Sequence, residues 1–101
     1  MNKVLSTAEN EVVRREILEL CQAAAPYGAG LPVLKASLRK TGYELAEKEL
    51  RCQADYLEGK GLIRRQEVKN WSLHIDRCIL FITPEGVDYL EGNGPDIAGV
   101  D

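Results

Sequence analysis

Residues 57–68 read LEGKGLIRRQEV, and this stretch decides which fold the chain adopts. A helical run ends here on Gly59 and Gly61, which stand one residue apart. Glycine readily takes the left-handed backbone conformation that ends a helix. Apolar residues follow at once, and an alternating pattern then runs on to Val68. The stretch therefore predicts an abrupt change from helix to strand.

Three helices are predicted upstream of this junction, at about residues 7–24, 32–40 and 45–58. Ser6 and Glu9 form a capping-box pattern before the first helix, whose apolar residues recur at helical spacing. Pro32 suits the first turn of the second helix because that position needs no N–H. We expect Val33 on the apolar face of that helix. Only the short segment TGYE separates the second helix from the third.

The chain downstream of the junction predicts an antiparallel hairpin. Its first strand runs through residues 62–68, and its second strand covers about residues 73–82, which are rich in apolar side chains. The polar pair Lys69 and Asn70 is expected to form the turn.

A short last helix is predicted after the hairpin, with Thr83 as its cap and Gly92 at its end. The order helix, helix, helix, strand, strand, helix indicates an α+β domain that covers residues 1–92. Residues 93–101 contain little to bury and are predicted to form a flexible C-terminal tail.

The length and composition of the 101-residue chain exclude several classes of protein. Its length suits one domain, and no apolar run approaches the ~20 residues of a membrane span. The N-terminus lacks the apolar stretch of a signal peptide, which predicts a cytoplasmic protein. Three cysteines and one histidine stand in none of the spacings typical of zinc sites. No catalytic motif is present, so we predict no metal, no cofactor and no enzymatic activity.

The charge is unevenly distributed along the chain. The net charge is −3, but residues 35–77 hold ten basic and seven acidic side chains, whereas residues 78–101 hold five acidic side chains and no basic one. Positive charge confined to the middle of a chain is typical of a local binding patch.

These segments resemble the winged helix-turn-helix domain over about residues 8–92. The resemblance is carried by a short helix, a tight turn, a helix ending in YLEGKGLI and a basic hairpin. LFITPEGVDYLEG is similar to the close of many bacterial regulators with this fold, and with GYELAEKEL it also resembles small proteins of Mu-like prophages. The resemblance implies a DNA-binding transcriptional regulator of phage, prophage or bacterial type, acting as a homodimer. Helix 45–58 would enter the major groove, and hairpin 62–82 would be the wing.

The resemblance also implies which side chains contact double-stranded DNA. They lie on the second helix, on or near the third helix, and on the hairpin: Lys35, Arg39, Lys40, Tyr43, Lys48, Arg51, Arg64, Arg65, Lys69, Asn70 and Trp71.

The third helix supports a second reading of the same fold. Its carboxylates outnumber its two cations, Lys48 and Arg51, and phosphates repel such a surface. A protein–protein interaction module without DNA binding is therefore the alternative. Trp71 fits a lid over the core better than a DNA wedge, because buried indole contributes much area. Ala46 stands where related sequences often have Ser or Thr, so the third helix is also compatible with a start at Tyr43 or Glu44.

Overall fold

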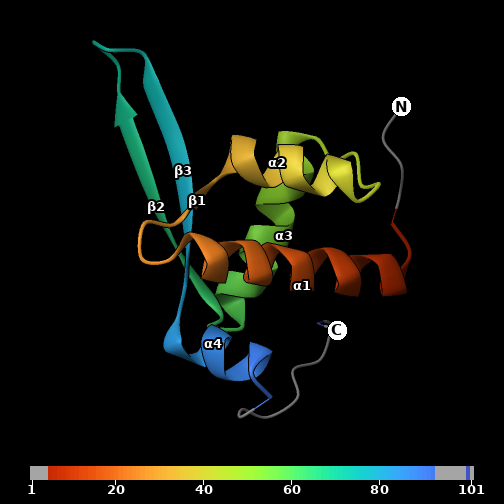
Figure 1. Cartoon of the computed structure of the whole chain (residues 1–101). Coiled ribbons are helices and arrows are strands. Elements are labelled where there is room, and N and C mark those ends of the chain that lie inside the picture. Colours follow the sequence, from red (N-terminus) through yellow and green to blue (C-terminus); the bar gives the residue numbers. More distant parts are fainter. Residues whose placement is uncertain (1–4, 93–99, 101) are drawn as a thin grey trace.

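The computed structural model describes residues 5–92 and Val100, and it contains four helices and three strands within them (Figure 1). The elements are α1 (Thr7–Ala24), β1 (Ala29–Gly30), α2 (Leu31–Lys40), α3 (Glu47–Gly59), β2 (Ile63–Asn70), β3 (Ile75–Ile82) and α4 (Pro84–Leu90). None of the helices in this part of the chain is both long and apolar enough to cross a bilayer.

Local capping signals fix where α1 begins. The Ser6 hydroxyl accepts a hydrogen bond from the Glu9 N–H at 3.2 Å, and the Glu9 carboxylate accepts one from the Ser6 N–H at 3.2 Å. This reciprocal box satisfies two N–H groups that have no partner within the helix. The predicted first helix is thus confirmed.

The start of α3 differs from the prediction. Ala46 is the N-cap, with an extended backbone at φ −73° and ψ 159°. Alanine has no side-chain acceptor, so only half of a capping box forms, from the Ala46 N–H to the Glu49 carboxylate at 2.9 Å. The helix therefore begins at Glu47, two residues after the predicted start at about residue 45 and later than the alternative starts at Tyr43 or Glu44. Leu45 precedes the helix in a non-helical segment and is buried in the core, at 3% exposed.

The sheet has a third strand that the sequence did not reveal. β2 and β3 pair antiparallel from Ile63↔Ile82 to Asn70↔Ile75, and β1 pairs with β3 on its other edge. A strand of two residues between helix-breaking residues carries no alternation to recognise.

The hairpin turn lies further along the chain than predicted. Lys69 and Asn70 belong to β2, and the turn covers residues 71–74. The Asn70 side chain accepts a hydrogen bond from the Leu73 N–H at 3.2 Å, an Asx-type contact that starts the turn there. His74 closes it with φ 53°.

The helices pack on one face of the sheet and enclose the core (Figure 1). Large side chains with almost no exposure come from α1, α2, α3, β3 and the α3–β2 junction: Val13, Ile17, Leu18, Leu34, Leu38, Leu50, Leu57, Leu62 and Leu80. Each stabilises the fold by about 1.5–3 kcal/mol. Val33 was expected on this face but is 60% exposed, because Leu31 occupies the inward position of the first turn of α2.

The start of α4 is bound to the base of the hairpin. Thr83 caps the helix by accepting from the Gly86 N–H at 3.1 Å, as predicted, and its hydroxyl donates to the Gly61 carbonyl at 2.7 Å. A Cβ at Gly86 would collide with the Leu62 carbonyl oxygen, so α4 approaches the junction as closely as backbone allows.

In the predicted tail, the Val100 side chain is buried, and its backbone carbonyl accepts a hydrogen bond from the Tyr89 hydroxyl at 2.9 Å. Its other residues lie outside the described part.

Candidate nucleic-acid interface

The candidate interface consists of α3 and the β2–β3 hairpin that projects beyond the helices (Figure 1). α3 carries four carboxylates and two cations, which leaves −2. The strands β2 and β3 carry four cations and two carboxylates, which leaves +2. The two elements of a potential DNA-binding surface therefore have opposite net charge.

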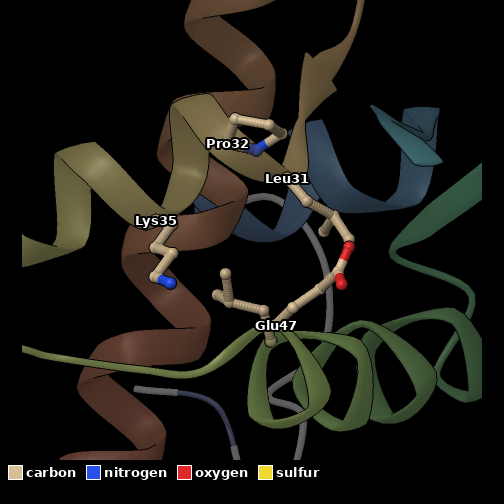
Figure 2. A pocket seen from close by; sticks show the side chains of 5 residues that line it. Leu31, Pro32, Lys35 and Glu47 are labelled. Atoms are coloured by element: carbon tan, nitrogen blue, oxygen red, sulfur yellow. The ribbon is translucent and has the colours of Figure 1, made fainter. Parts of the chain in front are cut away.

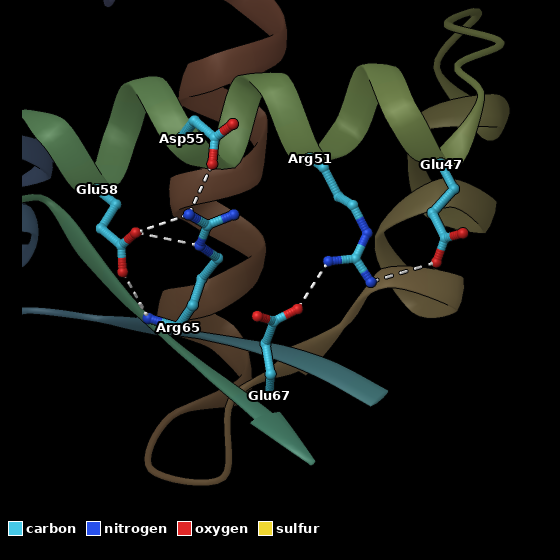
Figure 3. A network of polar contacts seen from close by, with 6 residues as sticks. All are labelled: Glu47, Arg51, Asp55, Glu58, Arg65 and Glu67. Carbon is cyan, nitrogen blue, oxygen red and sulfur yellow. Dashed lines mark hydrogen bonds and ion pairs between the residues drawn. The ribbon is translucent and has the colours of Figure 1, made fainter. Parts of the chain in front are cut away.

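Arg51 connects α3 to the hairpin. Its guanidinium lies 2.9 Å from the Glu67 carboxylate on β2 and 3.7 Å from the Glu47 carboxylate one turn earlier on α3 (Figure 3). The hydrogen bond to Glu67 raises the pKa of Arg51, and the same bond lowers the pKa of Glu67. Both side chains are therefore charged near neutral pH.

Arg65 makes a second and denser connection. The Glu58 carboxylate accepts from its guanidinium at 2.8 and 3.1 Å and also from its backbone N–H at 3.2 Å. The Asp55 carboxylate lies 2.6 Å from the same guanidinium (Figure 3). The hydrogen bond to Glu58 is the main reason why the pKa of Arg65 is raised.

Arg64 lies on the opposite face of the sheet from Arg65. Arg65 pairs in register with the buried Leu80, on the face that the helices cover, whereas Arg64 pairs with Phe81. The Arg64 guanidinium stacks on the Phe81 ring at 4.3 Å from its centroid. The two neighbouring arginines therefore do not form one patch.

The candidates on α2 and in the turn before α3 are spread over several environments. Arg39 is paired with Glu44 at 3.1 Å, and both side chains are largely exposed. Lys35 lines a shallow pocket of about 230 Å³ between α2 and α3, opposite Glu47 (Figure 2). Tyr43 packs against the core, and Lys40 is exposed at the end of α2.

The tip of the hairpin is apolar and open to solvent. Trp71 is 85% exposed and Leu73 is 66% exposed. The expectation that Trp71 covers the core is wrong, because β2 and β3 carry the turn away from the helices. Lys69 near the tip and Lys48 on α3 are exposed and form no ion pair within residues 5–92.

The other flank of α3 holds a polar cluster that the sequence did not reveal. Gln53 is 8% exposed, accepts from Arg14 Nε at 2.7 Å and donates to Asn10 Oδ1 at 2.7 Å. The Arg14 guanidinium also stacks on Tyr56 at 3.7 Å from the ring centroid. Gln53 adjoins the apolar stripe of α3, and that position was the available signal for burial.

The cysteines occupy two kinds of environment. Burial raises the pKa of Cys21 to about 12 and also raises the pKa of Cys78, so both thiols stay protonated near neutral pH. Cys52 is exposed, on the same open face of α3 as Lys48. Within the described part of the chain, no group of three or more His, Cys, Asp or Glu side chains is placed to hold a metal ion.

The backbone is similar to two solved regulators. One is a "PadR-like Transcription factor from bacteroid fragilis", with a TM-score of 0.69 and 15% identity over 84% of this chain and 79% of that chain. The other is a transcriptional regulator from Clostridium thermocellum, with a TM-score of 0.67 and 22% identity over 89% of this chain and 84% of that chain. No family model and no curated protein matches this chain. The chain has the winged helix-turn-helix fold, with the β2–β3 hairpin in the place of the wing.

Proposed function

We propose that the protein is a winged-helix DNA-binding regulator of transcription, with α3 in the major groove and the hairpin against the adjoining backbone. The observation that carries this proposal is an open face of α3, with Lys48 and Cys52 exposed, beside a projecting hairpin of net charge +2. Recognition helices of this motif read base edges while neighbouring cations contact phosphates. The regulators with similar backbones support the proposal.

A bacterial or prophage regulator acting as a cytoplasmic homodimer is the finer form of this proposal. One copy presents one recognition helix, and two copies related by a two-fold axis would read two half-sites. Size-exclusion chromatography with light scattering on the full chain tests the dimer, which is expected to have twice the 11.2 kDa mass.

A fluorescence-anisotropy titration of mixed-sequence duplex DNA tests the proposal directly. Binding is expected at ~50 mM salt, where attraction to phosphates is strong, and it should weaken steeply as salt increases. Lys48→Gln should weaken binding and reduce the salt dependence by about one phosphate contact. The control is Lys60→Gln, which removes the same charge beside Tyr56 on the α1 side of α3. Equal effects of both variants would contradict the placement of α3.

The exposed thiol of Cys52 gives an independent test. Bound DNA should slow its alkylation, because the thiol lies on the face that would enter the groove. Unchanged alkylation under saturating DNA would remove α3 from the interface.

A protein-interaction module is the second candidate function. It is favoured by the −2 charge of α3 and by the carboxylates that already occupy Arg51 and Arg65. This reading predicts no DNA binding at ~50 mM salt. It also predicts a stoichiometric protein partner, without nucleic acid, when the chain is purified from its cells.

A further inference from the structure

We propose that Glu67 is an internal competitor of DNA phosphate, and that it holds Arg51 out of the DNA interface until DNA displaces it. This inference rests on the proposed function and adds a regulatory contact to the same site. It assigns opposite roles to the two arginines that connect α3 with the hairpin: Arg51 is exchangeable and Arg65 is a permanent brace.

The contacts of Arg51 are few and accessible. It has one short contact between elements, to Glu67 at 2.9 Å, and a longer one to Glu47 at 3.7 Å. The Arg51 side chain is 31% exposed and the Glu67 side chain is 48% exposed, so water and ions reach the pair. An ion pair of this kind contributes little to stability and is easily exchanged.

The contacts of Arg65 are more numerous and better covered. Glu58 binds both its guanidinium and its backbone N–H, and Asp55 adds a third carboxylate oxygen. The Arg65 side chain is 22% exposed. Displacing it would break several charge-assisted hydrogen bonds at once, so DNA phosphates do not compete for it effectively.

Arg51 also has a short path to the open face of α3. Its side chain points from α3 toward Glu67 on β2 (Figure 3). Lys48 lies about 60° from Arg51 around the helix axis, at 100° per residue. A change of side-chain rotamer would therefore move the guanidinium from Glu67 to the side where a phosphate would lie. Carboxylate and phosphate bind guanidinium in the same planar geometry, which makes the exchange chemically direct.

The negative charge around Arg51 is the reason why competition between Glu67 and a DNA phosphate would affect binding. Glu47, Asp55, Glu58 and Glu67 surround two arginines, which leaves this network at −2 (Figure 3). Phosphates therefore meet a surface where the carboxylates have already neutralised the cations. Release of Arg51 supplies one cation and also requires Glu67 to lose its partner.

A double-mutant cycle with Glu67→Gln and Arg51→Met tests the inference by DNA titration over a salt series. Glu67→Gln in the natural chain should tighten binding roughly tenfold, the scale of one charge-assisted hydrogen bond. It should also steepen the slope of log K against log salt by about 0.9, the value for one added phosphate contact. In the Arg51→Met background the same substitution should change neither quantity.

Asp76→Asn is the matched charge control. It removes one negative charge from the same hairpin, and Asp76 forms no ion pair in the part of the chain that the structure describes. This variant should leave the salt slope unchanged. Glu67 lies on an exposed strand position, so all variants are expected to fold, and circular dichroism verifies this.

The outcomes separate the inference from the proposed function. A gain from Glu67→Gln that persists in the Arg51→Met background, or that Asp76→Asn reproduces, would overturn the inference and leave DNA binding intact. If the wild type binds DNA and Glu67→Gln binds it no more tightly, the inference is likewise overturned and the proposed function stands. No binding by either the wild type or Glu67→Gln at ~50 mM salt would overturn the proposed function, and the inference with it.

Discussion

Arginines contact both flanks of α3, but the partner of one arginine is buried and the partner of the other is half exposed. On the α1 side, Arg14 binds Gln53, which is 8% exposed, at 2.7 Å. On the hairpin side, Arg51 binds Glu67, whose side chain is 48% exposed, at 2.9 Å. The distances are nearly equal, so distance does not reveal what each contact does. The degree of burial does distinguish the two contacts, because a polar group that water cannot reach is destabilising unless it keeps its hydrogen-bond partner.

The difference has a functional consequence. The buried contact of Gln53 on the α1 flank fixes the position of α3, whereas the hairpin flank includes the exposed Arg51–Glu67 pair, which salt screens and competing anions replace. One helix thus combines a fixed side and an adjustable side.

The largest expected effect is that of Gln53→Ala. The substitution removes the acceptor that Arg14 uses and the donor that Asn10 uses, in a site with little access to water. We expect the free energy of unfolding to fall by about 2 kcal/mol. Urea denaturation measures it, and a loss below ~0.5 kcal/mol would show that this flank is no more structural than the other.

Arg65→Ala should have the next largest effect on stability. It leaves Glu58 and Asp55 without their common cation and frees the end of α3 from β2. We expect a loss of about 1 kcal/mol, together with faster hydrogen exchange in the hairpin. Arg64→Ala is the control, because its guanidinium stacks on Phe81 on the opposite face. If hydrogen exchange in the hairpin became faster in Arg64→Ala but not in Arg65→Ala, the assignment of Arg65 as the brace would be contradicted.

Arg51→Ala should lower the free energy of unfolding by a smaller amount, about 0.5 kcal/mol at low salt, because its main partner, Glu67, is half exposed. The cost should largely disappear at ~1 M salt, where the screening length is about 3 Å. The cost of Gln53→Ala should stay the same in both conditions. A salt-independent loss at Arg51 would remove the distinction between the flanks.

The smallest expected effect is a pH dependence. The hydrogen bond from Arg51 lowers the pKa of Glu67 from its ordinary value of 4.5. A carboxylate with a lowered pKa adds stability above its unfolded pKa, and that stability is lost as pH falls through its folded pKa. Glu67→Gln should therefore make the urea midpoint fall less steeply between about pH 6 and pH 3. Superimposable pH profiles of variant and wild type would show that the pair contributes nothing.

Capping signals made much of the fold predictable from the sequence. Ser6 and Glu9 located the start of α1, and Thr83 located the start of α4. Gly61, at φ 77°, marked the change from helix to wing. These signals act within four residues along the chain, so no tertiary contact is needed to recognise them.

The features that were missed depend on contacts between distant residues. β1 exists only because β3 offers an edge to pair with. The side-chain hydrogen-bond partners of Arg51 and Gln53 lie 16 to 43 residues away along the chain, a separation at which sequence spacing gives no information. The separation of Arg64 from Arg65 was predictable in principle, since alternation along a strand sends neighbours to opposite faces. The DNA-contact roles of the candidate residues stay predictions.

The attachment of Thr83 and Gly86 to the Gly61–Leu62 backbone turns the hairpin into a lever with a fixed pivot. Eight-residue strands reach about 26 Å from that pivot, at about 3.3 Å per residue. A tilt of about 10° at the base would thus sweep the indole of Trp71 through roughly 5 Å, given that reach. Small adjustments where α4 meets the junction are therefore magnified into large displacements at the far end.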